Sequence, residues 1–142
     1  MTTEQPHPIT LQTVLFVRST VVAIQSHVPS ETLLSASPEN NIAVNKVEGQ
    51  SGIYNASMRT VINAAMDASS PYFIDMECVA VLVADDTLSE EEALRGVTIT
   101  AHSVLYGAIR ESVAWLTSRQ PFGSLMLGLS VLKPAAAVSA SA

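Results

Sequence analysis

The stretch that decides the fold runs from Thr100 to Leu129 and reads TAHSVLYGAIRESVAWLTSRQPFGSLMLGL. Apolar and small residues recur in its first part at helical spacing, which predicts a long helix. The apolar stripe is wider than that of an ordinary surface helix, so we expect cover on two sides. One cover is expected to be the chain's own sheet, and the other a second subunit that the small residues would let approach closely. The residues predicted for this subunit interface are Ala101, Val104, Leu105, Ala108, Ser112 and Trp115.

Pro121 predicts the end of this helix, because proline has no N–H to donate and disfavours a helical residue before it. A short apolar arm follows, in which five large apolar residues stand among glycines. This is too much apolar surface for a free loop, so we expect the arm to dock on another surface. The five residues are Phe122, Leu125, Met126, Leu127 and Leu129.

The run LYGAIRESVAWLTSRQPFGSLML, residues 105–127, resembles a segment of the bacterial export chaperone SecB. In the family this segment reads L-F-P-Y-A-R-E, an apolar helix, S-R-G and then F-P-x-L-x-L. The sequence departs from that pattern at Gly107, Ala108, Gln120 and Gly123, where the family has Pro, Tyr, Gly and Pro. The matching residues are Leu105, Arg110, Glu111, Ser118, Arg119, Phe122, Leu125 and Leu127.

The resemblance implies an α+β fold with a four-stranded antiparallel sheet and helices on one face. It also implies a homotetramer built as a dimer of dimers. In the family, extended unfolded clients bind in grooves between the connection after the first strand and the loop after the long helix. In this sequence both segments carry apolar residues, which predict a groove that adapts to many partners. Each apolar group could instead only close the core of its own subunit. The predicted groove residues are Leu33, Leu34, Ile42, Val44, Val47, Phe122, Leu125, Met126, Leu127 and Leu129.

One family feature is missing from the sequence. SecB passes clients to the translocase motor through acidic residues on the exposed face of its sheet. Here residues 19–25 contain no acid, and Met76 occupies the aligned acidic position between Asp75 and Glu77. These differences speak against docking to the motor.

Strand patterns account for the first half of the chain. Residues 9–24 are rich in β-branched residues, 42–47 form a short extended piece, and 54–66 and 72–83 alternate with period two. The sequence predicts a hairpin at 67–71 between the last two strands. We expect residues 1–8 to be a loose arm, 9–132 a single domain and the Ala/Ser-rich 133–142 a flexible tail.

Before the long helix, Ser89 and Glu92 match a capping box. The pattern predicts a short helix from there to Arg95, ended by Gly96. The main helix would then start afresh with Thr98 or Thr100 as its cap.

Composition limits the partners. Charged residues make up only 14% of the 142 residues and apolar ones 48%, which favours an oligomer or an adhesive surface. The net charge of −6 and the scattered basic residues speak against nucleic-acid binding. No apolar run reaches the ~20 residues of a membrane helix, and residues 1–10 do not resemble a signal peptide. The lone Cys78 cannot form an internal disulfide, so a cytoplasmic location is expected.

The sequence offers little for catalysis. His7, His27 and His102 are far apart in the sequence, so no metal or cofactor is expected. His102 is expected near the surface at a helix start, and Cys78 is expected to be a small buried apolar residue. Neither a glycine-rich phosphate loop nor a GxSxG elbow occurs, so we do not expect an enzyme.

Two functions therefore remain open. One is an ATP-independent holding chaperone that binds extended or unfolded polypeptides, with a link to protein export left open. The other is a specific interaction protein on the same scaffold, of a phage or regulator type, that modulates one partner.

Overall fold

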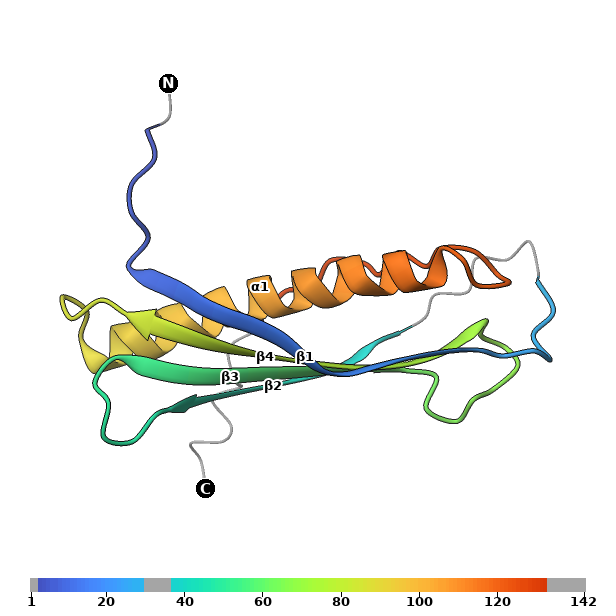
Figure 1. Cartoon of the computed structure of the whole chain (residues 1–142), viewed down its shortest axis with the longest axis horizontal. Helices are drawn as coiled ribbons and strands as arrows, with labels where there is room; N and C mark the ends of the chain where they lie inside the picture. Colours follow the sequence, from blue (N-terminus) through green and yellow to red (C-terminus); the bar gives the residue numbers. More distant parts are fainter. Residues whose placement is uncertain (1–2, 30–36, 133–142) are drawn as a thin grey trace.

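Four strands and one helix form the described part of the computed structural model, which is residues 3–29 and 37–132. The strands make one antiparallel sheet in the order β1-β4-β3-β2, and α1 crosses one face of it (Figure 1). The predicted α+β architecture, a four-stranded antiparallel sheet under one long helix, is therefore confirmed. The elements are β1 (Ile9–Ala23), β2 (Glu39–Lys46), β3 (Ile53–Ile62), β4 (Tyr72–Ala84) and α1 (Glu90–Thr117).

The core lies between α1 and the two central strands. Alternate residues of β3 and β4 point toward α1 and are buried, as the period-two pattern predicts. Cys78 is fully buried among them, which confirms its prediction as a small apolar core residue. From the helix, the fully buried side chains are Val97, Ala101, Leu105, Ile109 and Val113.

β1 is a long edge strand with two irregularities. Its register against β4 shifts between Leu11 and Thr13 and again between Phe16 and Arg18, and such bulges bend a strand. Most of its residues are exposed, including apolar ones such as Leu15 and Val17. A long edge of this kind offers unpaired backbone groups and apolar side chains to another chain.

The predicted short helix ending at Gly96 is wrong. Ser89 does cap a helix, and its capping box with Glu92 is present, but the helix continues without a break to Thr117. A Cβ atom added at Gly96 would lie 3.4 Å from the side chain of Ile9, which is an ordinary van der Waals contact. Because Ala93 and Val97 on either side are buried against the sheet, their packing outweighs the low helix propensity of glycine.

Strand ends also differ from the prediction. β3 ends at Ile62, four residues early, because Asn63 and Met66 adopt positive φ angles that turn the chain. β2 begins at Glu39, three residues before the predicted start, where Asn40 bonds the buried Thr60 of β3.

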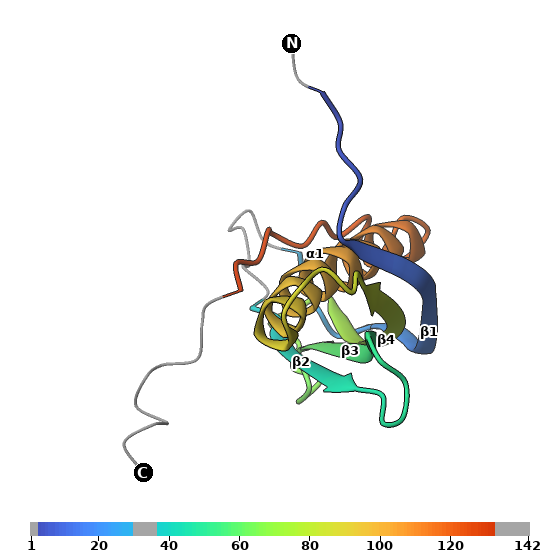
Figure 2. The same cartoon turned by 90° about the vertical axis from the view of Figure 1, so that its left-hand side faces the viewer.

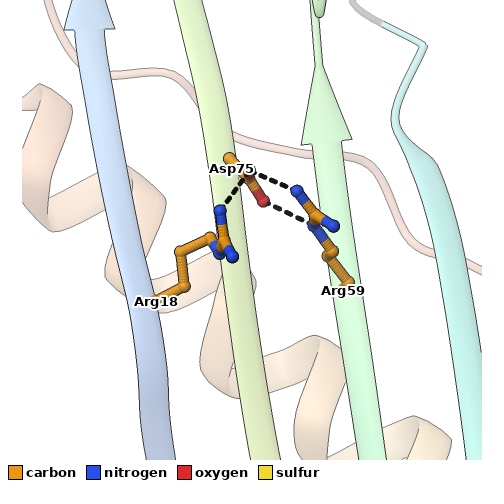
Figure 3. A network of polar contacts seen from close by, with 3 residues as sticks. All are labelled: Arg18, Arg59 and Asp75. Carbon is orange, nitrogen blue, oxygen red and sulfur yellow. Dashed lines mark hydrogen bonds and ion pairs between the residues drawn. The ribbon is translucent and has the colours of Figure 1, made fainter.

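The sheet face opposite α1 carries a charged network that joins three strands (Figure 3). Asp75 of β4 accepts two hydrogen bonds from Arg59 of β3, at 2.9 and 2.7 Å, and one from Arg18 of β1 at 3.3 Å. The bonds from Arg59, and then the charges of both arginines, hold the pKa of Asp75 below its ordinary value despite its burial. The network therefore favours the ionised carboxylate and ties β1 to β3 across β4.

The lowered pKa of Asp75 predicts a pH dependence of stability. A depressed folded-state pKa adds stability above the unfolded-state pKa of about 4, and this is lost as pH falls through the folded-state pKa. The free energy of unfolding is thus expected to fall more steeply below pH ~4 in the wild type than in Asp75→Asn. Urea unfolding of both proteins from pH 7 to pH 3 measures the difference. Parallel curves of unfolding free energy against pH would show that the two arginines do not stabilise the ionised Asp75.

Candidate polypeptide-binding site

After α1 the chain turns back along its own helix. We call residues 121–132 the C-terminal arm. Figures 1 and 2 both show the arm on the side of α1 that lies above β2, with β1 on the opposite side. None of the arm residues belongs to a helix or strand, so their backbone groups need partners from elsewhere.

Side chains of α1 supply those partners in antiparallel order. Thr117 accepts a hydrogen bond from the Leu125 amide at 2.8 Å. Arg110 donates from Nε to the Leu127 carbonyl at 2.9 Å, and Tyr106 donates from its hydroxyl to the Gly128 carbonyl at 2.8 Å. One turn further, His102 Nε2 lies 3.3 Å from the Ser130 hydroxyl. The helix therefore holds the arm along its length, as a neighbouring strand would.

The start of the arm is fixed by aromatic contacts. Phe122 meets the ring of His27 edge to face, with ring centroids 5.0 Å apart, and the ring of Tyr72 at 6.0 Å. Tyr72 also donates its hydroxyl to the Gly123 carbonyl at 2.6 Å, and its burial raises the pKa of that hydroxyl. His27 lies 2.7 Å from the Ala68 carbonyl through Nδ1. The connection after β1, the β3–β4 turn and the arm thus meet at one point.

The predicted groove residues of the arm divide into two sets. Phe122 and Leu125 are partly buried against the core, and Leu127 is buried. Met126 and Leu129 point outward, with 68% and 86% of their surface exposed. Val131, which the sequence analysis did not select, is exposed in the same way.

The other predicted groove residues lie on or beside β2. Ile42 and Val44 are partly buried against the same core as Phe122 and Leu125. Val47 lies at the β2–β3 turn and lines a separate hollow there with residues 46–51. Leu33 and Leu34 lie outside the described residues.

Two open hollows line the outer side of α1 next to the arm, and both touch Gly107 and Arg110. The first, about 530 Å³, lies between residues 99–110 of α1 and residues 129–132 of the arm. The second, about 600 Å³, lies near the end of the helix between Trp115 and Met126. Outward apolar residues of the arm therefore border hollows whose other wall is the helix.

The predicted subunit-interface residues also divide. Ala101 and Leu105 are fully buried beneath α1 in the chain's own core. Val104, Ala108 and Ser112 are partly buried, and Trp115 is 74% exposed. At 3.6 residues per turn, Val104, Ala108 and Ser112 lie on the flank of α1 away from the side that binds the arm, whereas Trp115 faces outward and lines the second hollow with Met126.

The residues that hold the arm were missed from sequence. Arg110 was selected only as a match to the family segment, and His102 was expected near the surface at a helix start. His102 is instead buried in mid-helix, because α1 begins at Ser89 and not at Thr100. The available signal was the four-residue spacing of His102, Tyr106 and Arg110, which sets polar groups on one helical stripe.

Within residues 3–29 and 37–132, no group of three potential metal-ligating side chains comes together. No helix of this described part is long and apolar enough to cross a bilayer. What the site offers is apolar surface on a backbone held in place by hydrogen bonds.

Comparison with solved structures finds proteins of similar fold. The SecB-like chaperone Rv1957 of Mycobacterium tuberculosis, solved with a ChAD peptide from the antitoxin Rv1956 HigA1, matches 87% of this chain and 91% of its own, with a TM-score of 0.66 and 19% identity. This chain has the SecB-like fold. A Streptococcus agalactiae protein of unknown function matches more loosely, over 85% of this chain and 97% of its own, with a TM-score of 0.51 and 10% identity. No protein-family model matches the sequence, and no curated protein shows significant similarity to it. The resemblance to SecB that residues 105–127 show is thus confirmed at the level of the fold.

The hydrogen bond that Thr117 accepts from the Leu125 amide gives a testable prediction. Thr117→Val keeps the shape of this buried residue but leaves the Leu125 amide without its partner. We expect a loss of about 1–2 kcal/mol of stability and faster hydrogen exchange in the arm. Exchange measured by mass spectrometry on arm peptides checks this. Thr98→Val is the matched control, because it loses only the hydrogen bond from the Thr98 hydroxyl to the Leu94 carbonyl within α1. This variant should leave hydrogen exchange in the arm unchanged.

Proposed function

We propose that this SecB-like chain is a non-enzymatic, ATP-independent chaperone that binds extended polypeptide segments. The binding surface is the outer side of the C-terminal arm together with the adjoining stripe of α1. The observation that carries this proposal is that Met126, Leu129 and Val131 are held facing outward by an arm that the helix fixes in place.

Physical reasoning supports a binding role for this surface. An apolar side chain on a free loop loses conformational freedom when it binds, whereas one on a fixed backbone loses less. Methionine and leucine side chains still change rotamer, so the same frame accommodates different sequences. The SecB-like chaperone Rv1957 was solved with a peptide of another protein, which agrees with a polypeptide ligand.

A dedicated partner is the second candidate. In Rv1957 the peptide comes from an antitoxin. In this chain, Asp75 on the open sheet face is engaged by Arg18 and Arg59, and Met76 points into the core. A carboxylate already paired with two arginines attracts a basic motor segment weakly, so a link to protein export is the less favoured form of the proposal.

We further propose that the chain forms a homo-oligomer through the other flank of α1. Val104, Ala108 and Ser112 on this flank and the outward-facing Trp115 remain candidates for the interface, whereas Ala101 and Leu105 are too deep to reach a second subunit. The exposed edge β1 adjoins this flank and adds apolar surface. A dimer of dimers would scatter light as four times 15.0 kDa, and Trp115→Lys should lower that mass. A wild-type monomer would contradict this part of the proposal.

The holding activity is tested with the outward residues of the arm. Met126→Asp combined with Leu129→Asp should abolish the suppression of aggregation of several unrelated unfolded proteins. The loss follows from placing two charges where apolar side chains of the client would bind. The fold should persist, because both side chains are exposed. Light scattering of heated client proteins measures the activity.

The matched control is Leu94→Asp, which adds a charge at an exposed leucine near the other end of α1. This variant should keep full activity. If the wild type suppressed the aggregation of only one client protein, the dedicated-partner function would be favoured. Equal activity of the double variant and the wild type would place the binding surface elsewhere.

A further inference from the structure

The first hollow beside α1 contains an arginine with unusual surroundings. Its lining from the arm is Leu129, Ser130, Val131 and Leu132, and from the helix it includes Ile99 and the stacked rings of His102 and Tyr106. Arg110 closes one end. No carboxylate occurs among the described residues that line this hollow, so a single positive charge borders a largely apolar space.

Four of the other five basic residues of the described chain are neutralised locally. Arg18 and Arg59 pair with Asp75, Lys46 pairs with Glu90, and Arg95 pairs with Glu91. Among the described residues, no carboxylate comes within ion-pair distance of Arg110. Arg119 also lacks an ion pair among the described residues, but it is exposed to water, whereas Arg110 is partly buried. The hollow beside Arg110 therefore lacks the counter-charge that this protein supplies to most of its cations.

The guanidinium of Arg110 is also oriented in advance. Its Nε–H is bound to the Leu127 carbonyl at 2.9 Å, which leaves the four terminal N–H donors for another group. Arg110 is partly buried, so an anion bound there would be partly shielded from water. Hydrogen bonds between arginine and carboxylate in such a setting are about twice as strong as neutral ones.

We propose that this hollow binds an extended segment of a partner protein in which an acidic side chain has apolar neighbours, with Arg110 holding the carboxylate. The inference rests on the proposed polypeptide-binding function and adds to it the chemistry of the preferred segment. From Ile99 to Arg110 the helix rises about 16 Å, which an extended chain spans with about five residues. The apolar neighbours of the acid would lie along Leu129, Val131 and Leu132.

Two blocked peptides test this preference. Each has nine residues, with Leu, Val, Ala and Ser on both sides of a central Asp in one and a central Asn in the other. Blocked ends remove every other charge, so the peptides differ by a single carboxylate. Calorimetry on the full chain should find the Asp peptide bound about tenfold more tightly, with a preference that shrinks as salt is added.

Variants separate recognition from support of the arm. Arg110→Gln should bring the affinity ratio of the two peptides to about one, and Arg110→Lys should restore part of it. Tyr106→Phe is the matched control, because it loses the bond to the Gly128 carbonyl without any change of charge. In this control both peptides should weaken equally and the ratio should stay near ten.

Several results would overturn the inference. These are equal affinities for the two peptides in the wild type, an unchanged ratio in Arg110→Gln, or binding that occurs only when an oligomer dissociates. Failure of both peptides to bind would also overturn it. If the chain still suppressed aggregation in that case, the proposed function would stand on another surface, and if it did not, both proposals would fall.

Discussion

The hydrogen bonds from side chains of α1 to the backbone of the C-terminal arm are the interaction on which the candidate site depends. The arm has no strand beside it, and an extended backbone against an apolar core must find partners for its polar groups. Tyr106, Arg110 and Thr117 supply them at intervals that match the pitch of the helix. Because these bonds fix the backbone, each side chain of the arm has a set direction. Leu127 enters the core, and Met126 and Leu129 face solvent.

This arrangement gives α1 three tasks. One stripe covers the sheet, a second holds the arm, and a third remains for another molecule. The sequence showed an apolar stripe too wide for a single contact, and the structure shows that part of the second cover is the chain's own arm. The inference of a second subunit therefore rests on a narrower set of residues, with Trp115 as the most exposed.

The sheet, its antiparallel order and the long helix could be predicted, because period-two and helical patterns reflect burial directly. The break at Gly96 was predicted wrongly, since local propensity ignores the packing of Ala93 and Val97 on the sheet. The direction of each arm residue could not be predicted, because an irregular segment has no period. Only the contacts with Thr117 and Arg110 decide which side chains enter the core. The charged network on the open face was missed for a similar reason, as Arg18, Arg59 and Asp75 meet only when three strands align.

Binding of polypeptides to the arm is tested most directly by site-specific photo-crosslinking to a permanently unfolded protein. A photoreactive amino acid is placed at position 129 on the outer side of the arm, and in a second sample at position 94 on the same helix face but distant from it. If the arm binds polypeptides, strong crosslinks are expected from position 129 and few from position 94. Equal yields from both positions, or crosslinks from position 94 alone, would show that the arm is not the surface that binds polypeptides.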